Sequence, residues 1–443
     1  MKHITIVNHT SEILLVECET RGKHEVKVLL PSLYASTSID RATELTLSTP
    51  ATNHGDAKEG FTVVPNAYTI SLSMDLGAMW KLMNVPGSCP WRIYRCRSSR
   101  RHHRLLILPR RDLSSFLANM PDTVPLSSLT LPGTHDTMAF YGWPISQCQS
   151  LATPLAVQLQ SGIRVLDIRL AVVDSRLIAF HGIYPQRTPF QEILATIHSF
   201  LTAPATCRET LVMSIKQEDF LKTPAALFSQ LVHDEIVNGP GGLGMWFLEN
   251  RVPHLGDVRG KVVMFSRFGG SGDGWEGGLE GLGMHPTVWP DSAKSGFAWQ
   301  CKNTLVRTHD WYNIPSFLSI PEKTQLATEI LLPPADAQPF PTLAITYFSA
   351  SSFPLAFPPT VARGFGYPQY GLGVEGVNGR VGKWLLDFLG GQDDVCEKRL
   401  DGDVRIRGWA FMDFFMDPED GGMVPLLVEC NYRGRRPGEE GWP

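Results

Sequence analysis

The stretch LPGTHDTMAF, residues 131–140, decides the interpretation of this 443-residue chain. Its apolar beginning indicates the end of a buried strand, and His135 and Asp136 follow at once. A histidine beside a carboxylate at the mouth of a strand can move protons near neutral pH. A catalytic interpretation therefore requires partners for this pair at the ends of other strands.

The segment 111–443 alternates short apolar strand candidates with helical stretches. The strand candidates are SLTLPGTHD, RVLDIRL, RLIAFHG, TLVMSIKQE, KVVMFSRF, TLVRTHDWY, TLAITYFSA and GWAFMDF. Eight β elements with helices between them predict an α/β fold, a (β/α)8 barrel of the TIM type. Only AVVDS separates the second candidate from the third, which is too short for a helix, so we expect an irregular barrel.

Residues 1–110 have a different pattern, with strand candidates such as KHITIVNHT, EILLVEC and RLLILP between turn-rich stretches. This alternation predicts a small all-β, sandwich-like N-terminal domain. We find no catalytic constellation in it. Its role stays open between a structural one and binding to a partner or a membrane surface.

The composition limits the class of function. With 43% hydrophobic and 19% charged residues the chain can form a packed core, and its net charge of −4 argues against nucleic acid as a partner. The eight cysteines are scattered without a CxxC pair, so no zinc site is expected. No apolar run could span a bilayer, and MKHITIVNHTSEILLVECET does not resemble a secretory signal. We therefore expect a cytoplasmic protein with peripheral membrane association.

Polar side chains stand at the ends of the strand candidates. They are His135, Asp136, Asp167, Arg169, His181, Lys216, Glu218, Arg267, Asp310, Tyr312 and Asp413. In a barrel these ends converge on the face that carries active sites. Each residue alone is equally well explained as a helix cap or an ion-pair partner. Burying so many charges at one rim for structure alone would add little stability, so together they indicate a functional site.

This set of side chains suits phosphoryl transfer. One histidine can accept a proton from an attacking hydroxyl while the other protonates the leaving oxygen, and each needs a carboxylate to fix its tautomer. An arginine between them would stabilise the charge that builds on the phosphoryl oxygens.

The motifs LPGTHDTM, VLDIR, AFHG, MSIKQE, FSRF, HDWY and GWAFMDF, in this order, resemble the X domain of phosphatidylinositol-specific phospholipase C over roughly residues 111–432. The resemblance implies an enzyme that acts at a membrane surface on phosphatidylinositol or a related inositol lipid. The implied products are diacylglycerol and inositol 1,2-cyclic phosphate.

The resemblance also implies roles for individual residues. His135 would be the general base for the inositol 2-hydroxyl, with Asp413 as its carboxylate partner. His181 would be the general acid for the diacylglycerol oxygen, supported by Asp136. Arg169 would stabilise the transition state. The implied substrate-binding residues are Lys216, Arg267 and Asp310 at inositol hydroxyls, Tyr312 against the ring, and Asp167 in the polar network.

The family includes a calcium-dependent type with anionic metal ligands on these strands. Here Arg169 and Lys216 stand where two of those ligands would be needed, and neither has an oxygen to offer a hard cation. The chain therefore resembles the bacterial, metal-independent type. We expect no metal and no cofactor, with Arg169 in the place of calcium.

Two loops are expected on the catalytic face, FGGSGDGWEGGLEGLGMHPTVWPD and SSFPLAFPPT. Aromatic side chains at a rim favour the bilayer interface, so Trp275 and Trp289 are predicted to contact the membrane. The alternative, that these loops simply pack on the barrel, is left open.

Two other functions also stay open. One is a phospholipase D-like enzyme or a glycerophosphodiester phosphodiesterase on the same barrel, which would use metal-binding carboxylates and is disfavoured by Arg169 and Lys216. The other is a non-enzymatic lipid-binding protein, which predicts the loss of some catalytic residue.

Overall fold

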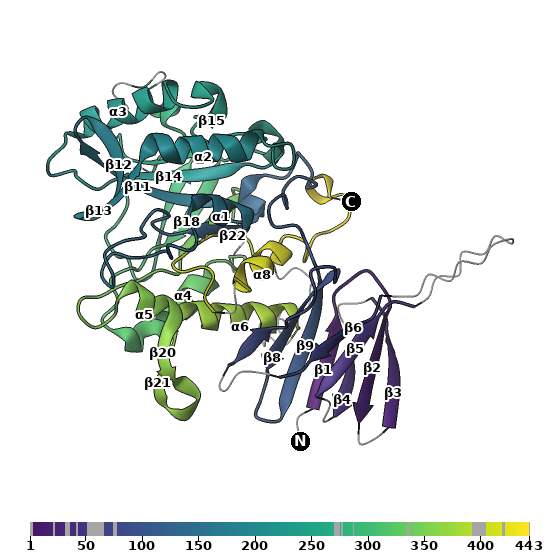
Figure 1. Ribbon diagram of the computed structural model, residues 1–443. Helices are drawn as coiled ribbons and strands as arrows, with labels where there is room; N and C mark the ends of the chain where they lie inside the picture. The colour runs from purple at the N-terminus through teal and green to yellow at the C-terminus, as the bar shows by residue number, and fades with distance from the viewer. Residues whose placement is uncertain are drawn as a thin grey trace, which may run out of the picture. The chain divides into compact units, whose positions relative to one another are not determined.

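The computed structural model describes all residues except 1–2, 21–22, 32–35, 41–42, 51–65, 74–77, 270–274, 276–277, 287, 335, 337, 392–404, 419–420 and 443. The chain divides into two compact units (Figure 1). The first consists of Met1–Arg111 and Gly382–Leu400, and the second of Asp112–Val381 and Asp401–Pro443.

The first unit contains two β-sheets. One has the order β4 (Ser36–Asp40), β1 (His3–Asn8), β9 (His102–Pro109), β8 (Trp91–Arg97) and β7 (Trp80–Leu82). The other has the order β3 (Lys23–Leu29), β2 (Leu14–Thr20), β5 (Glu44–Ser48) and β6 (Tyr68–Ser71). Apolar side chains of both sheets, among them Ile6, Ile93, Val16 and Leu47, form one buried core. Two sheets that share a core in this way make a β-sandwich.

The second unit is built around a larger sheet. Its hydrogen-bonded order is β15 (Trp246–Phe247), β16 (Val262–Arg267), β14 (Leu211–Gln217), β11 (Val165–Val173), β10 (Thr130–Thr134), β22 (Gly408–Met412), β19 (Thr342–Tyr347), β18 (Thr304–His309) and β17 (Phe297–Cys301). Neighbours from β15 to β18 are parallel. Parallel strands are covered on both faces, and every residue of β10 and β22 is buried. Gly133 allows β10 to approach β11, because a Cβ there would lie 2.8 Å from Val165 Cβ.

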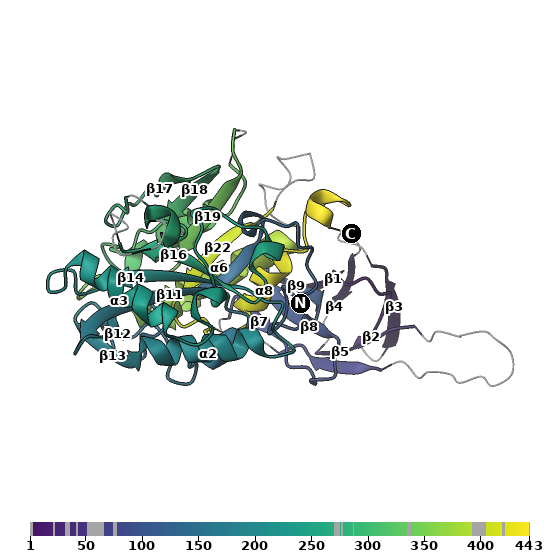
Figure 2. The same cartoon turned by 90° about the horizontal axis from the view of Figure 1, so that it is seen from above.

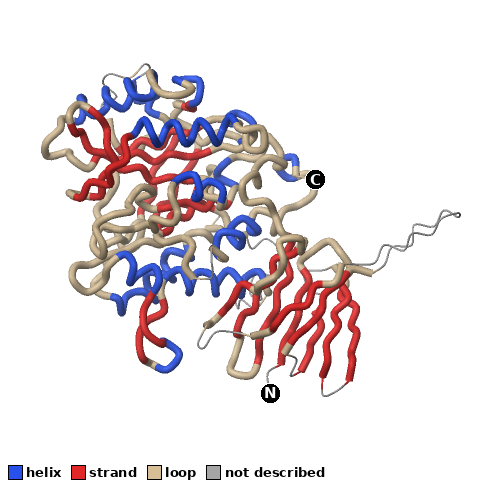
Figure 3. The backbone as a smooth tube through the Cα atoms, viewed as in Figure 1, coloured by secondary structure: helices blue, strands red, loops and turns tan. Residues whose placement is uncertain are grey.

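Helices flank this sheet, as Figures 2 and 3 show. They are α1 (Leu155–Gln160), α2 (Phe190–Thr202), α3 (Ala225–Val237), α4 (Ile320–Glu329), α5 (Pro358–Arg363) and α8 (Met423–Cys430). A further helix, α6 (Val377–Leu389), begins in the second unit and ends in the first. A separate hairpin, β20 (Gly364–Tyr367) and β21 (Leu372–Glu375), follows α5. Helix α2 buries Phe190, Ile193, Leu194 and Ile197, a spacing that places one apolar stripe on one face.

The sheet departs from the predicted eightfold barrel in two places. The expected third barrel strand, β12 (Arg176–His181), pairs antiparallel with β11 and with β13 (Tyr184–Pro189). The reason is a tight turn in AVVDS, where Asp174 and Ser175 both have positive φ, as two-residue hairpin turns require. In addition, no pairing among the described residues joins β16 to β18, so the curled sheet stays open there. The prediction of an irregular α/β barrel therefore holds in its coarser part, an α/β unit with a curled sheet, while the described residues do not close a barrel of eight strands.

Within the described ranges, no helix is long and apolar enough to cross a bilayer.

Candidate active site

A cavity of about 480 Å³ opens at the carboxyl ends of the parallel strands. Its lining includes His135, Arg169, His181, Lys216, Arg267, Asp310, Tyr312 and Asp413. Asp136 and Asp167, at most 1% exposed, lie behind this lining and contact Arg169. The structure therefore brings together ten of the residues selected from the strand ends.

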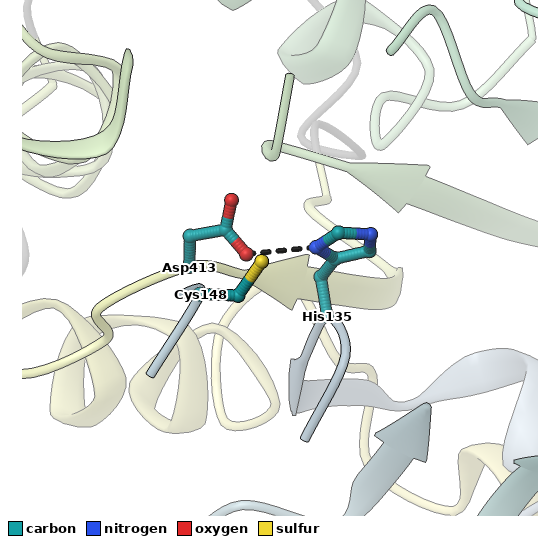
Figure 4. A group of neighbouring side chains, drawn as sticks. All are labelled: His135, Cys148 and Asp413. Atoms are coloured by element: carbon teal, nitrogen blue, oxygen red, sulfur yellow. Dashed lines mark hydrogen bonds and ion pairs between the residues drawn. The ribbon is translucent and has the colours of Figure 1, made fainter. Parts of the chain in front are cut away.

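His135 and Asp413 form the first acid–base pair. They follow β10 and β22, whose last residues are paired in the sheet, so the two side chains emerge next to each other. His135 Nδ1 lies 2.8 Å from Asp413 Oδ1 (Figure 4). Because a carboxylate accepts the Nδ1 hydrogen, Nε2 is left with its lone pair. Arg169 Nη2 donates to this Nε2 at 2.6 Å.

His181 and Asp136 form the second pair. His181 Nδ1 lies 2.7 Å from the Ser146 carbonyl oxygen and 3.3 Å from Asp136 Oδ2. Burial, and then the charges of Arg169 and His135, lower the pKa of His181 to about 3. Burial raises the pKa of Asp136 well above its usual value although Arg169 opposes this. Both shifts favour the neutral forms of the two groups in the free protein.

Arg169 is the charge at the centre of the cluster. Its Nε lies 3.0 Å from Asp167 Oδ2 and 3.7 Å from Asp136 Oδ2, and its Nη1 lies 3.5 Å from Glu218 Oε1. Burial alone would raise the pKa of Asp167, but Arg169 and Arg267 lower it below its usual range. Arg169 is thus a fixed cation whose position is set by carboxylates.

Lys216 is paired with Glu218, a residue noted at its strand end but given no role from the sequence. Lys216 Nζ lies 2.8 Å from Glu218 Oε1. Burial and Arg169 lower the pKa of Lys216, although Glu218 opposes this. The two residues are separated by two positions at the end of β14, so their side chains point to the same side of the strand.

A second part of the cavity wall is formed by Arg267, Trp289 and Asp310. The guanidinium carbon of Arg267 lies 4.0 Å from the centroid of the Trp289 ring, and Trp289 Nε1 donates to Asp310 Oδ2 at 2.9 Å. Tyr312 Oη donates to Asp291 Oδ1 at 2.5 Å. This bond, together with burial, raises the pKa of Tyr312 to about 12.

The predicted membrane contacts of Trp275 and Trp289 need correction. Trp275 is 6% exposed, and its Nε1 donates to Ser229 Oγ at 2.6 Å, so the residue packs inside the protein. Trp289 forms part of the cavity wall instead. Other residues of the same glycine-rich loop, 270–274, 276–277 and 287, lie outside the described residues.

Cys148 is a further member of the cluster that the sequence did not reveal. It follows β10 in an irregular loop and is fully buried, with Sγ 3.7 Å from His181 Nδ1. Among the described residues, two groups have the ligand atoms and spacing to hold a metal ion, and both include this thiol. They are His135, Cys148 and Asp413, and Asp136, Cys148 and His181.

Fold and site together define a class of α/β protein with a curled parallel sheet and a cavity of acid–base groups at its carboxyl edge. Residues 124–268 match the family described as phosphatidylinositol-specific phospholipase C, X domain. The resemblance predicted from the motifs is therefore confirmed for this segment.

Individual relatives agree with this match. The 1-phosphatidylinositol phosphodiesterase of Listeria monocytogenes is 32% identical over 162 residues, which are 34% of this chain and 48% of that protein. The enzyme of the same name from Staphylococcus aureus (strain Newman) is 26% identical over 167 residues, 35% of this chain and 52% of that protein. The chain thus spans about half the length of the curated relatives that it matches.

A solved structure supports the fold independently. The phosphatidylinositol-specific phospholipase C of S. aureus is 18% identical, with a TM-score of 0.52, and the match covers 72% of this chain and 97% of that one. At this identity the likeness shows a shared fold.

Proposed function

We propose that this protein is a metal-independent phosphatidylinositol-specific phospholipase C. The observation that supports this most strongly is the grouping of two His–carboxylate pairs around Arg169 in one cavity. The ring centroids of His135 and His181 are 6.3 Å apart. This spacing lets one phosphoryl group lie between a base and an acid.

The proposed reaction is an intramolecular transesterification. His135 Nε2 accepts the proton of the inositol 2-hydroxyl, whose oxygen then attacks phosphorus. The bond between phosphorus and the diacylglycerol oxygen breaks, and His181 donates a proton to that oxygen. The products are inositol 1,2-cyclic phosphate and diacylglycerol, and water can later open the cyclic ester by the reverse use of the two histidines.

His181 must gain a proton before it can act as an acid. A neutral His181 cannot donate the required proton, because its pKa is about 3 in the free protein. A bound phosphodiester brings a negative charge that raises this pKa, since an anion favours the imidazolium form. Nδ1 already carries the hydrogen given to the Ser146 carbonyl, so the added proton enters at Nε2 from solvent. Asp136, whose Oδ2 lies 3.3 Å from Nδ1, loses its proton to solvent and stabilises the imidazolium as a carboxylate. Substrate binding thereby creates the general acid.

The residues at the cluster do not fit the calcium ion of the calcium-dependent type. The carboxylates of Asp136, Asp167 and Glu218 are each paired with Arg169, and Lys216 contacts Glu218 as well. A calcium ion would need six to eight oxygen ligands and would meet two cations here. Arg169 therefore supplies the positive charge at the phosphoryl oxygens in the proposed mechanism.

The headgroup is proposed to bind between the two walls of the cavity. Lys216 and Arg267 can donate hydrogen bonds to inositol hydroxyls, and Asp310 can accept one. Tyr312 is 40% exposed at the mouth, where its ring can lie against the sugar. These polar groups suit a neutral polyol joined to a single phosphodiester.

Peripheral binding to a membrane is proposed through exposed apolar side chains around the mouth. Ile183 is 85% exposed two residues after His181, and Trp143, 63% exposed, lies in the loop that follows β10. Phe353 and Leu355 follow β19 and are 77% and 54% exposed. Apolar and aromatic residues at one rim favour the bilayer interface. The cytoplasmic location expected from the sequence stays a prediction.

The experiment that tests this function uses the purified full chain with phosphatidylinositol vesicles in excess chelator. Phosphorus NMR should show inositol 1,2-cyclic phosphate as the first product. Cleavage that requires an added metal, or that gives phosphatidic acid or acts only on glycerophosphodiesters, would favour the alternative enzymes. Vesicle binding without any turnover would favour a lipid-binding protein.

A further inference from the structure

The thiol of Cys148 lies between the two acid–base pairs. Cys148 is 0% exposed, with Sγ 3.7 Å from His181 Nδ1. On its other side the sulfur lies beside the carboxylate of Asp413 (Figure 4). The proposed acid–base mechanism gives this thiol no part.

A second observation points to a ligand at the same place. Asp136 is 1% exposed, and its Oδ2 accepts no hydrogen bond within the described part of the chain. An oxygen of the same carboxyl group, Cys148 Sγ and a ring nitrogen of His181 all lie within 4.8 Å of one another. A buried carboxyl oxygen without a hydrogen-bond donor is costly, and a cation would satisfy it.

Distances between the ligand atoms distinguish the group of Asp136, Cys148 and His181 from the second possible metal group, which consists of His135, Cys148 and Asp413. Zinc bonds of about 2.0–2.3 Å at tetrahedral angles separate two ligand atoms by about 3.3–3.7 Å. His181 Nδ1 lies 3.3 Å from Asp136 Oδ2 and 3.7 Å from Cys148 Sγ, which fits that spacing. His135 Nδ1 and Asp413 Oδ1 are 2.8 Å apart, which is a hydrogen bond and too close for two ligands of one ion.

We propose that Asp136, Cys148 and His181 form an inhibitory site for a thiophilic divalent cation such as Zn²⁺. Bonds form from the metal to Oδ2, Sγ and Nδ1, and the fourth position takes water. The thiol and carboxyl protons leave to solvent, and the ring proton of His181 moves from Nδ1 to Nε2. Two anionic ligands then neutralise the ion, and no oxidation or reduction takes place.

The bound ion stops the proposed reaction at the general acid. With Nδ1 held by the metal, the ring of His181 keeps a single hydrogen, on Nε2, and cannot become the imidazolium that protonates the leaving oxygen, so the inhibitory half of this inference rests on the proposed function. Thiolate and imidazole favour Zn²⁺ over Ca²⁺ and Mg²⁺. Arg169 Nε, 3.7 Å from Asp136 Oδ2, opposes the ion, and this opposition is reduced by its contacts with Asp167 and Glu218.

The test of the site uses Co²⁺ as a spectroscopic probe of the full chain, because a thiolate–cobalt bond gives a near-ultraviolet charge-transfer band. The wild type and Cys207→Ser, which removes an exposed cysteine away from the cavity, should both show the band. Cys148→Ser should lack it, and Cys148→Ala should behave alike, with folding checked by circular dichroism. A wild type without the band at saturating Co²⁺, or an equal band in Cys148→Ser, would overturn the site.

A second measurement tests inhibition. Zn²⁺ should inhibit phosphatidylinositol cleavage reversibly, and Cys148→Ser, compared with its own metal-free rate, should need at least about tenfold more Zn²⁺. Inhibition should strengthen as pH rises, because binding releases protons. If no turnover is found, the cobalt band still decides the site. If the band appears but Zn²⁺ inhibits both proteins equally, inhibition through this site is wrong.

Discussion

Arg169 Nη2 lies 2.6 Å from His135 Nε2, the ring nitrogen opposite the one that contacts Asp413. The same guanidinium is held through its Nε by Asp167 at 3.0 Å. A hydroxyl that is to lose its proton to Nε2 must displace Nη2 from that nitrogen. In the proposed mechanism the displaced Nη2 would then be available to the phosphoryl oxygens, so substrate entry would free the base and redirect the cation together.

The first prediction concerns the two histidines. His135→Ala and His181→Ala should each lower kcat on phosphatidylinositol by about 10²–10⁴-fold, because each removes one proton-transfer group. The measurement is initial-rate kinetics with short-chain phosphatidylinositol. His24→Ala, at an exposed histidine of the first unit, is the control and should keep the wild-type rate. Wild-type activity in either cavity variant would refute its assignment.

The second prediction concerns Arg169 and metals. Chelator should leave wild-type activity unchanged, and Arg169→Ala should lower kcat by about 10²–10³-fold through loss of charge at the phosphoryl oxygens. Arg169→Asp restores a carboxylate and should be weak but partly responsive to calcium, since Lys216 still opposes a full site. If the wild type instead loses activity in chelator and recovers with calcium, Asp136, Asp167 and Glu218 become candidate ligands.

Residues at the ends of parallel strands could be found from the sequence. Four of these residues stand at or just after the end of an apolar run: His135, Arg169, Lys216 and Asp413. The carboxyl ends of parallel strands lie at one edge of the sheet. No further three-dimensional information was needed to expect them near one another. Nine of the eighteen described residues that line the cavity followed from this rule.

Features that depend on packing could not be found in this way. Cys148 lies in an irregular loop with no periodicity, so nothing in its neighbourhood marks it as part of the cluster. Trp275 has the same local sequence character as a membrane anchor, and only its contacts with Ser229 and Phe268 show that it is buried. The antiparallel placement of β12 depends on positive φ at Asp174 and Ser175. Because neither residue is a glycine, the sequence does not indicate this backbone conformation.

The third prediction concerns the membrane. Ile183→Ser and Phe353→Ser should weaken binding to phosphatidylinositol vesicles more than they lower turnover of a soluble short-chain substrate. Both side chains are exposed, and they follow Gly182 and Ser351 of the cavity lining by one and two residues. Vesicle co-sedimentation and kinetics measure the two effects. Val28→Ser, at a 62% exposed site on β3, is the control for loss of surface apolarity. Equal losses on both substrates would argue against a membrane role.

Trp275→Ala should behave differently from the variants at the mouth. It should lower the free energy of unfolding by about 3–5 kcal/mol, as expected for a large aromatic side chain removed from a packed interior. Urea denaturation measures this loss. A variant with wild-type stability and weak vesicle binding would restore the original membrane assignment.

The last prediction separates the members of the Asp136–His181 pair by the pH dependence of stability. The folded state holds the pKa of His181 near 3, against a usual value of 6.5, so this residue alone costs stability as pH falls below 6.5. The folded state raises the pKa of Asp136 above its usual 3.8, so this residue alone gains stability as pH falls through the raised value. In the wild type the two contributions oppose each other. Between about pH 6.5 and pH 4 the unfolded state holds a proton on His181, whereas the folded state favours the neutral imidazole and the protonated carboxyl group of Asp136.

Removing one partner should expose the contribution of the other. Between about pH 6.5 and pH 4, Asp136→Asn should lose stability more steeply than the wild type, and His181→Asn less steeply. A difference of one bound proton corresponds to about 1.4 kcal/mol per pH unit, which urea denaturation at a series of pH values can resolve. Parallel curves for all three proteins would mean that the free protein does not hold the pair as a neutral imidazole and a neutral carboxyl group, and the proposed protonation of His181 on substrate binding would fail with it.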